Sequence, residues 1–332
     1  MAGIERHVIA LPDVGAVQDI RSVIPWDLDI RLLEGGNAAG SIETISAKRV
    51  SLSRFHFPWK LHQRGAPPPG MRTFGIGVEP GQRLPFCGYP LQDDWLVAFP
   101  SASGFDAQSD VSFRTYGLTV DEALMEETAS ALGLPSPADT VPEVGVFGAS
   151  HAQASGIRES LNRIFRVASQ PRRDICEPGL VRALEGDLVA QLLGMLSGDS
   201  ERRSRPRYRD RALNRCLEFI EQPTRRLISV QELCEVSGAS WRTLDYAFKE
   251  RFGVTPQAYL RARRLNAVQS ELRDARSERG AVARVAGEWE FWHMGDFAGG
   301  YRQLFGELPS ETLGRQSHVP GLGPEVATQG RA

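Results

Sequence analysis

Six polar and aromatic side chains share the outer face of a helix that the sequence predicts over residues 241–252. Leu244, Phe248 and Phe252 recur at helical spacing and would pack inward, which leaves the other face exposed. Arginine can bond guanine edges or phosphates, threonine and tryptophan can pack on a thymine methyl group, and tyrosine or lysine can hold phosphates. The candidate DNA contacts are Trp241, Arg242, Thr243, Asp245, Tyr246 and Lys249. Alternatively, these side chains only solvate the helix.

Capping residues define the elements that would position this face. Ser229, with Glu232 three residues later, forms a capping box and predicts the start of a preceding helix. Gly238 suits a sharp left-handed turn, Ser240 suits the N-cap of the second helix, and Gly253 suits its end. Two helices joined in this way form a helix-turn-helix, whose second helix enters the major groove of DNA.

The same layout recurs over residues 281–306, with Phe297, Tyr301 and Phe305 on the inner face of the second helix. Between the copies, residues 256–275 predict a connecting helix whose Arg261 and Arg264 can contact phosphates. Two units on one chain predict the reading of two successive major-groove segments.

The block from about residue 209 to 315 resembles the DNA-binding domain of the AraC/XylS transcriptional regulators. The resemblance is carried by WRTLDYAFKERFGVTPQAYLRARRLNAVQSEL and FWHMGDFAGGYRQLFGELPSETL, which are most similar to the regulators of ethanolamine-utilisation operons. The family joins two helix-turn-helix units by one long helix and favours activation through RNA polymerase. It implies that the second unit meets DNA around His293, Met294 and Asp296.

The second unit departs from the family pattern in two ways. Glu290 stands where the family has glycine before Phe291. Gly295, Gly299 and Gly300 leave its recognition helix few side chains that could reach a base, and each glycine costs roughly 1 kcal/mol of helix stability. We therefore expect backbone contacts from the second unit and base readout mainly from the first.

Short β-rich runs separated by proline and glycine occupy about residues 40–122, which predicts an all-β barrel or sandwich. AraC/XylS regulators commonly carry a cupin-like barrel at this point as the effector sensor, and such a barrel can hold one small ligand. Each candidate effector contact, taken singly, is more often a core or surface residue than a ligand contact. These candidates are Arg54, His56, Trp59, Phe74 and Trp95.

Two helical stretches follow at about 150–197, and leucines recur every four residues from Leu180 to Leu196. Such a seam can pack on the barrel and on a second copy of the chain. We therefore expect a homodimer through Leu184, Leu188 and Leu192. The predicted organisation is α+β: a sensing and dimerisation domain at 1–200, a linker at 201–207, the DNA-binding domain at 208–315 and a disordered tail at 316–332.

The composition fits two domains, because 332 residues with 41% hydrophobic content can bury two cores. A net charge of −2 argues against a generic nucleic-acid coat. Four scattered cysteines lack zinc-site or disulfide spacing, so we expect no metal, no cofactor and a cytoplasmic location. The sequence lacks the pattern of a signal peptide or a membrane span.

Two other functions stay open. A cupin-like barrel can hold a metal for enzyme chemistry, but the first 150 residues contain only His7, His56 and His62 and no H-x-H pair with a downstream glutamate. We therefore expect no catalytic residues. A DNA-binding protein without effector is the second alternative, although an N-terminal domain of about 200 residues is large for that role. The predicted function is an effector-controlled transcription regulator that binds double-stranded DNA.

Overall fold

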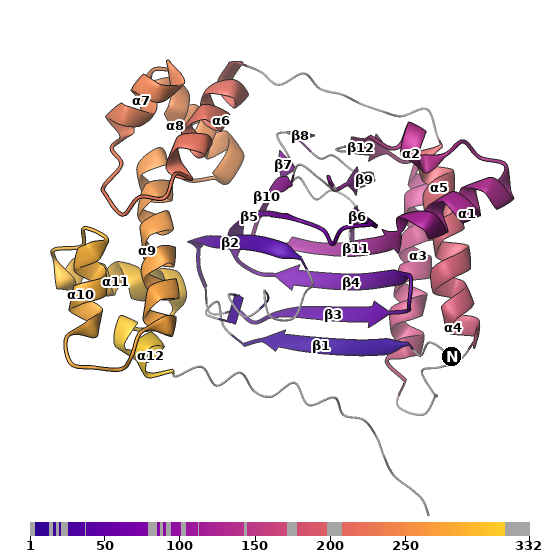
Figure 1. Cartoon of the computed structure of the whole chain (residues 1–332), viewed down its shortest axis with the longest axis horizontal. Coiled ribbons are helices and arrows are strands. Elements are labelled where there is room, and N and C mark those ends of the chain that lie inside the picture. Colours follow the sequence, from indigo (N-terminus) through magenta and orange to yellow (C-terminus); the bar gives the residue numbers. More distant parts are fainter. Residues whose placement is uncertain are drawn as a thin grey trace, which may run out of the picture.

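The chain folds into a β-sandwich with one group of helices on either side, as seen in the computed structural model (Figure 1). The structure describes residues 4–12, 16–17, 20, 26–36, 38–78, 85–86, 89–90, 94–100, 104–111, 113–142, 145–170, 178–197 and 208–315. The predicted linker and tail lie outside these residues. The expected α+β class, with an N-terminal β unit and a C-terminal pair of helix-turn-helix units, is confirmed.

The strands form two antiparallel sheets. The larger sheet has the order β1-β3-β4-β11-β6-β9-β12, built from Glu5–Leu11, Gly40–Ser46, Val50–Phe57, Phe113–Asp121, Met71–Gly77, Trp95–Ala98 and Gly145–Gly148. The smaller has the order β2-β5-β10-β7-β8, built from Asp27–Glu34, Lys60–Ala66, Phe105–Ser109, Pro85–Phe86 and Tyr89–Pro90. The β unit therefore begins well before residue 40. The sequence pattern missed β1 because that edge strand is mostly exposed and carries few buried residues.

A first group of helices covers the outer face of the larger sheet. They are α1 (Glu122–Leu132), α2 (Pro137–Thr140), α3 (His151–Ala168), α4 (Pro178–Arg182), a π-helical turn at Ala183–Leu188 and α5 (Val189–Leu196). Leu184, Leu188 and Leu192 are at most 1% exposed, and they share a core with Leu52 and Leu118 of the sheet. The predicted leucine seam thus packs inside its own subunit, because the apolar outer face of the sheet needs a cover.

The second group carries the two helix-turn-helix units. It comprises α6 (Tyr208–Ile220), α7 (Val230–Ser237), α8 (Trp241–Phe252), α9 (Pro256–Asp274), α10 (Ala281–Glu288), α11 (Met294–Phe305) and α12 (Pro309–Gly314). The predicted caps of the first unit are confirmed: Ser229 and Glu232 form a capping box, Ser240 accepts from the amide of Thr243, and Gly238 ends α7 in the left-handed conformation. Among the helices of the described ranges, none is long and apolar enough to cross a membrane.

One hydrophobic core joins the smaller sheet to these helices. Ile30 and Trp59 of the sandwich belong to the same cluster of buried residues as Phe252 and Leu265 of the helices. Asn266 of α9 accepts from the backbone amide of Leu32 and donates to its carbonyl, both at 2.9 Å. A side-chain amide therefore pairs with edge strand β2 as a neighbouring strand would, which leaves fewer free backbone groups on that edge.

Candidate nucleic-acid interface and ligand cavity

Helix α8 presents the predicted DNA contacts of the first unit to solvent. Leu244, Phe248 and Phe252 are fully buried, as the helical spacing predicted, while Trp241 and Tyr246 are 59% and 61% exposed. Arg242 is also exposed. The remaining candidates make local bonds: Thr243 shares a hydroxyl hydrogen bond with Ser240, and the Lys249 ammonium lies 2.8 Å from the Asp245 carboxylate. Trp241 and Arg242 lie at the N-terminus of α8, the end at which recognition helices contact bases.

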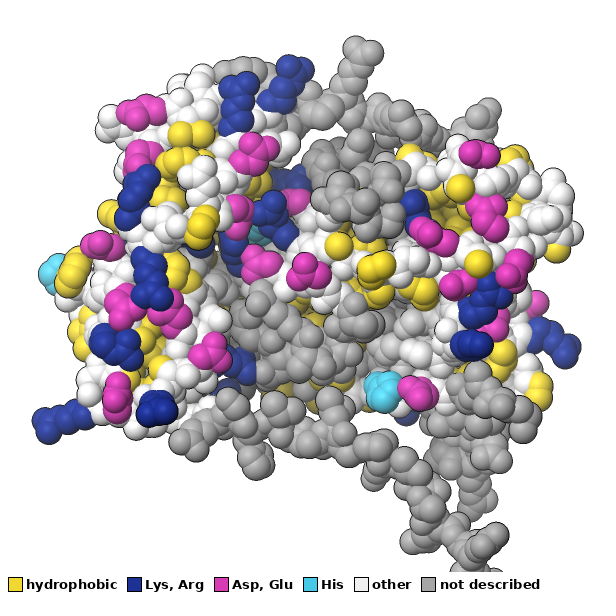
Figure 2. Space-filling model, in the orientation of Figure 1, with side chains coloured by type: hydrophobic (Ala, Val, Ile, Leu, Met, Phe, Trp, Pro, Cys, Tyr) yellow, Lys and Arg dark blue, Asp and Glu magenta, His cyan; other side chains and the backbone are white. Residues whose placement is uncertain are grey.

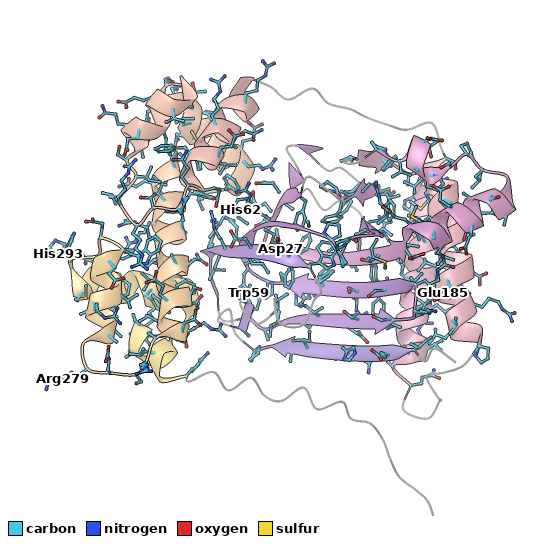
Figure 3. The ribbon with its side chains drawn as sticks, viewed as in Figure 1. Asp27, Trp59, His62, Glu185, Arg279 and His293 are labelled. Carbon is cyan, nitrogen blue, oxygen red and sulfur yellow. The ribbon has the colours of Figure 1, made fainter. Side chains whose placement is uncertain are left out.

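The second unit exposes a different surface. His293, Met294 and Asp296 are exposed at the start of α11, and Figure 3 places His293 on the side of the helices remote from the sandwich. A Cβ atom on Gly295 or Gly299 would meet nothing within 4 Å, so these glycines leave the recognition helix smooth. Trp292, which is 71% exposed, was not among the predicted DNA contacts. The sequence did contain a signal for Trp292: it lies just before α11, much as Trp241 lies at the start of α8.

Arg261 and Arg264 have structural roles between the two units. Arg261 donates to the backbone carbonyl of Asp296 at 3.1 Å and crosses α11 at Gly300, where a Cβ atom would stand 2.3 Å from its guanidinium. Arg264 lies 4.5 Å from the centre of the Phe291 ring and donates to the Trp289 carbonyl. Arg261 remains exposed, so it is also available to a phosphate, whereas Arg264 is half-buried.

A groove of about 680 Å³ separates the two units. Its rims carry Trp241 from the first unit and Trp292 from the second, and Arg261 and Arg264 of α9 line it. Figure 2 shows arginine and lysine side chains spread over the helical group at the left, with acidic side chains among them. The surface therefore carries charges of both signs. Such a surface favours contact with DNA at a few defined points over non-specific electrostatic binding along the duplex.

Glu290 adopts a backbone conformation that favours glycine. Its φ is +62°, in the left-handed region, at the position where the family resemblance implied glycine. Its carboxylate accepts a hydrogen bond from Trp292 Nε1 at 3.1 Å. Backbone strain that persists beside a functional surface often serves the site. Here the strained residue orients the exposed indole at the rim of the groove.

We expect Glu290→Gly to raise the free energy of unfolding by about 1 kcal/mol, because glycine adopts this φ without strain. Urea denaturation of the full chain measures the change. Glu278→Gly is the matched control: Glu278 is an exposed glutamate without a positive φ, so glycine there should be neutral or destabilising. Loss of stability in Glu290→Gly would show that the Trp292 hydrogen bond outweighs the strain.

Polar and charged side chains connect the smaller sheet to helices α8 and α9. His62 is 1% exposed; its Nε2 lies 3.0 Å from Asp106 Oδ2, and its Nδ1 lies 2.8 Å from the Tyr259 hydroxyl. Arg251 of α8 donates to Asp106 Oδ1 at 2.5 Å. Burial alone would raise the pKa of Asp106, but His62 and Arg251 hold it well below its usual range. We call His62, Asp106, Arg251 and Tyr259 the docking cluster.

A second ion-pair group lies beside the docking cluster. Arg31 of β2 donates to both carboxylate oxygens of Glu221, which follows α6, at 2.5 Å each. Arg64 of β5 reaches the same carboxylate at 3.2 Å and lies 3.6 Å from Asp106. Such fork-shaped pairs have a fixed geometry. The orientation of α6 and α8 relative to the sandwich is therefore specified by polar contacts as well as by the shared core.

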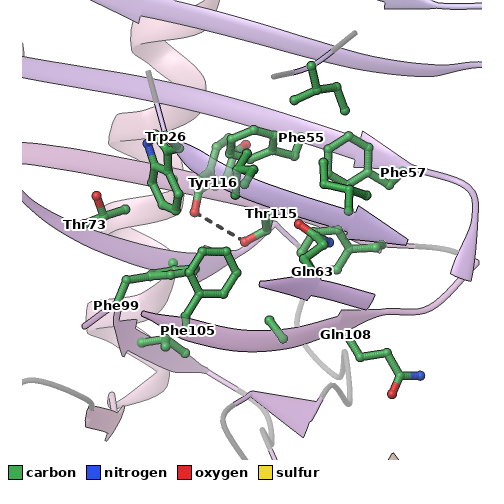
Figure 4. Close-up of a pocket in the computed structure, with 18 of the residues that line it drawn as sticks. Trp26, Phe55, Phe57, Gln63, Thr73, Phe99, Phe105, Gln108, Thr115 and Tyr116 are labelled. Atoms are coloured by element: carbon green, nitrogen blue, oxygen red, sulfur yellow. Dashed lines mark hydrogen bonds between the residues drawn. The ribbon is translucent and has the colours of Figure 1, made fainter. Parts of the chain in front are cut away.

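A cavity of about 90 Å³ lies between the two sheets (Figure 4). Aromatic rings dominate its lining: Trp26, Phe55, Trp95, Phe99, Phe105 and Phe113. Trp26, Phe99 and Phe105 meet edge to face, with ring centres 5.0 to 5.8 Å apart. Ligand sites are commonly concave, mostly apolar and supplied with few polar groups. This cavity has those properties.

Of the five predicted effector contacts, Trp95 lines this cavity. Arg54 lies outside it, paired with Glu43 and stacked on Phe165. His56 shares the strand face of Arg54 and is absent from the lining as well. The lining residues of the same strand are Phe55 and Phe57, one position away. Adjacent strand residues face opposite ways, so Arg54 and His56 point away from this cavity, and their role as effector contacts stays a prediction.

The other two predicted contacts are core residues. Phe74 is fully buried among the residues that meet α3 and α5. Trp59 is fully buried in the core shared with the helices, and its Nε1 donates to the Gly36 carbonyl at 3.3 Å. Within the described part of the chain, no three His, Cys, Asp or Glu side chains are grouped in a way that could hold a metal ion.

Comparison with known proteins agrees with the duplicated helix-turn-helix geometry. Residues 233–315 match the family described as a helix-turn-helix domain. XylDLEGF operon transcriptional activator 1 of Pseudomonas putida is 30% identical over 188 residues, 55% of each chain. XylDLEGF operon transcriptional activator 2 of the same species is 39% identical over 99 residues, 30% of this chain and 63% of that one. The chain spans about half the length of four of the curated relatives it matches.

Among solved structures, the AraC-like transcriptional activator CuxR is 12% identical, with a TM-score of 0.42 over 80% of this chain and 96% of that chain. The fold and the exposed helices define a protein with two helix-turn-helix units joined by the long helix α9. Residues 233–315 therefore form a helix-turn-helix domain, and about half of the chain is similar to a transcriptional activator of Pseudomonas putida. The narrower likeness to regulators of ethanolamine utilisation stays a prediction.

Proposed function

We propose that this protein is a sequence-specific DNA-binding transcription regulator that activates its target genes in response to a small molecule. One observation carries the proposal: the N-terminal ends of two successive recognition helices, α8 and α11, are both exposed on one helical block. In DNA-binding proteins this geometry serves two neighbouring major-groove segments. The relatives named above, which are called transcriptional activators, support the direction of control.

The proposal assigns double-stranded DNA, an effector and RNA polymerase as partners. The effector occupies the cavity between the sheets, where Trp95 is one contact. The protein acts at the bacterial nucleoid, since the DNA that it binds is promoter DNA. A homodimer belongs to the same proposal, but its interface uses residues other than Leu184, Leu188 and Leu192, because these are buried within the subunit.

The direct test is selection of duplexes from a random-sequence library by the full-length chain, followed by genomic footprinting. Enrichment of a defined motif supports the proposal, and its genomic positions name the controlled genes. A library that stays random after selection would refute sequence-specific binding. Activation is tested by transcription from the bound promoter with and without the protein.

We expect Arg242→Ala to weaken binding to the selected duplex by about 1 to 3 kcal/mol, because an arginine bonded to a base edge contributes that much discrimination. Binding to unrelated DNA should change little. Arg182→Ala serves as the control, since Arg182 is an exposed arginine on α4, remote from both recognition helices. Equal loss on both kinds of DNA would make Arg242 a phosphate contact.

A further inference from the structure

The cavity between the sheets has a lining that selects against charge. None of the described residues around it carries a charged side chain. An ion moved from water into such a lining would lose its hydration without gaining a partner, which is strongly unfavourable. The described lining therefore favours an uncharged ligand.

The size and walls of the cavity favour a single aromatic ring. Its volume of about 90 Å³ is far below the roughly 300 to 1,000 Å³ of sites for larger ligands, and closer to an apolar cavity of about 150 Å³ that takes benzene. Gly75 and Gly117 let aromatic rings rest on the sheet: a Cβ atom there would stand 3.1 Å from Phe99 and 3.0 Å from Phe55. Edge-to-face packing against such rings stabilises a planar aromatic guest.

Gln63 supplies the polar contact. Figure 4 shows its side chain beside Thr115 within the ring of lining residues, whereas the amide of Gln108 points away. The hydroxyls of Thr73 and Thr115 are already bonded to Thr119 and to the Ile76 carbonyl. The Gln63 side chain has no hydrogen bond to any residue that the structure describes. A free amide offers two donors and one acceptor.

We propose that the cavity binds a small uncharged aromatic molecule whose single polar group, an amide, carbonyl or hydroxyl, is hydrogen-bonded by Gln63. This assignment rests on the proposed function, in which the sandwich senses the effector. It also provides a short structural connection between the cavity and the helix-turn-helix block. Gln63 lies on β5 between His62 and Arg64. The side chains of these two neighbours point to the opposite face of the strand and contact Tyr259 and Glu221 of the helical block.

The test compares three probes of nearly equal shape on the full-length chain: benzamide, which is neutral, benzoate, an anion, and benzamidine, a cation. Quenching of tryptophan fluorescence reports binding, since Trp26 and Trp95 line the cavity. We expect benzamide to bind at least tenfold more tightly than either ion. Gln63→Leu should weaken benzamide about tenfold, the worth of a buried hydrogen bond. Gln63→Glu should reverse the order and favour benzamidine.

Two further variants serve as controls, one inside the cavity and one remote from it. Ala107→Leu fills the cavity from β10 and should abolish binding of all three probes, while Gln191→Leu, at an exposed site on α5, should change nothing. Benzoate binding as tight as benzamide, absence of benzamide binding to the wild-type chain, or full benzamide affinity in Gln63→Leu would each overturn the assignment. Selection of a DNA motif is measured separately. A chain that selects DNA but fails these tests loses only this inference, whereas one that selects no DNA loses the proposed function.

Discussion

Replacement of Asp106 by alanine is expected to lower the free energy of unfolding by about 2 to 4 kcal/mol. The Asp106 carboxylate is 22% exposed and pairs with buried His62 and with Arg251. Breaking a fully buried pair costs about 3 to 5 kcal/mol, because the remaining charge stays buried without its partner, and the partial exposure of Asp106 reduces that figure. Urea denaturation of the full chain measures the loss. Glu159→Ala, which removes an exposed carboxylate on α3, is the control and should change stability by less than about 0.5 kcal/mol.

The pH dependence of the same variant identifies the cause. The folded pKa of Asp106 is depressed, so its stabilisation is present above the unfolded value of about 3.9 and is lost as pH falls through the folded value. The difference in stability between wild type and Asp106→Ala should therefore be full at pH 7 and smaller at pH 3. A difference that stays constant over this range would indicate lost packing instead of lost ion pairing.

Leu188→Glu is expected to destabilise the chain by about 4 kcal/mol or more and to reduce the yield of folded protein. Leu188 is 1% exposed in the core beneath the larger sheet, where a carboxylate would find no counter-charge among the hydrophobic residues of its cluster. Gln191→Glu introduces the same group at an exposed position on the neighbouring turn and should leave stability within about 0.5 kcal/mol. A stable, soluble monomeric Leu188→Glu protein would mean that Leu188 faces a partner subunit instead.

The helix-turn-helix units could be predicted closely because their signals are local. Ser229, Gly238, Ser240 and Gly253 act through backbone geometry within a few residues, so the sequence alone determined where α7 and α8 begin and end. The exposed face of α8 followed from the buried positions of the same helix. Trp292 was not predicted because it lies in the turn before α11 and not on the recognition helix itself.

The lining of the cavity between the sheets was harder to predict because it depends on which way each strand faces. On β4, Arg54 and His56 looked chemically suited to a ligand, yet the cavity uses Phe55. A pattern of alternation gives two faces but does not say which one the second sheet covers. The docking cluster could not be predicted from the sequence either. His62 and Asp106 lie 44 positions apart and meet Arg251 and Tyr259 only in the folded chain, so each resembled an ordinary polar surface residue.

The pairing of Asn266 with the edge of β2 bears on how such proteins can be recombined. A helix-turn-helix block joined to its N-terminal sandwich by a tether alone could be exchanged freely between relatives. Here the edge strand β2, Arg31 and His62 of the sandwich each contact a particular residue on the helix-turn-helix block. A chimaera that takes either half from a relative must therefore bring matching residues at 221, 251, 259 and 266. Substitutions that preserve each half separately can still produce a hybrid whose two parts no longer recognise each other.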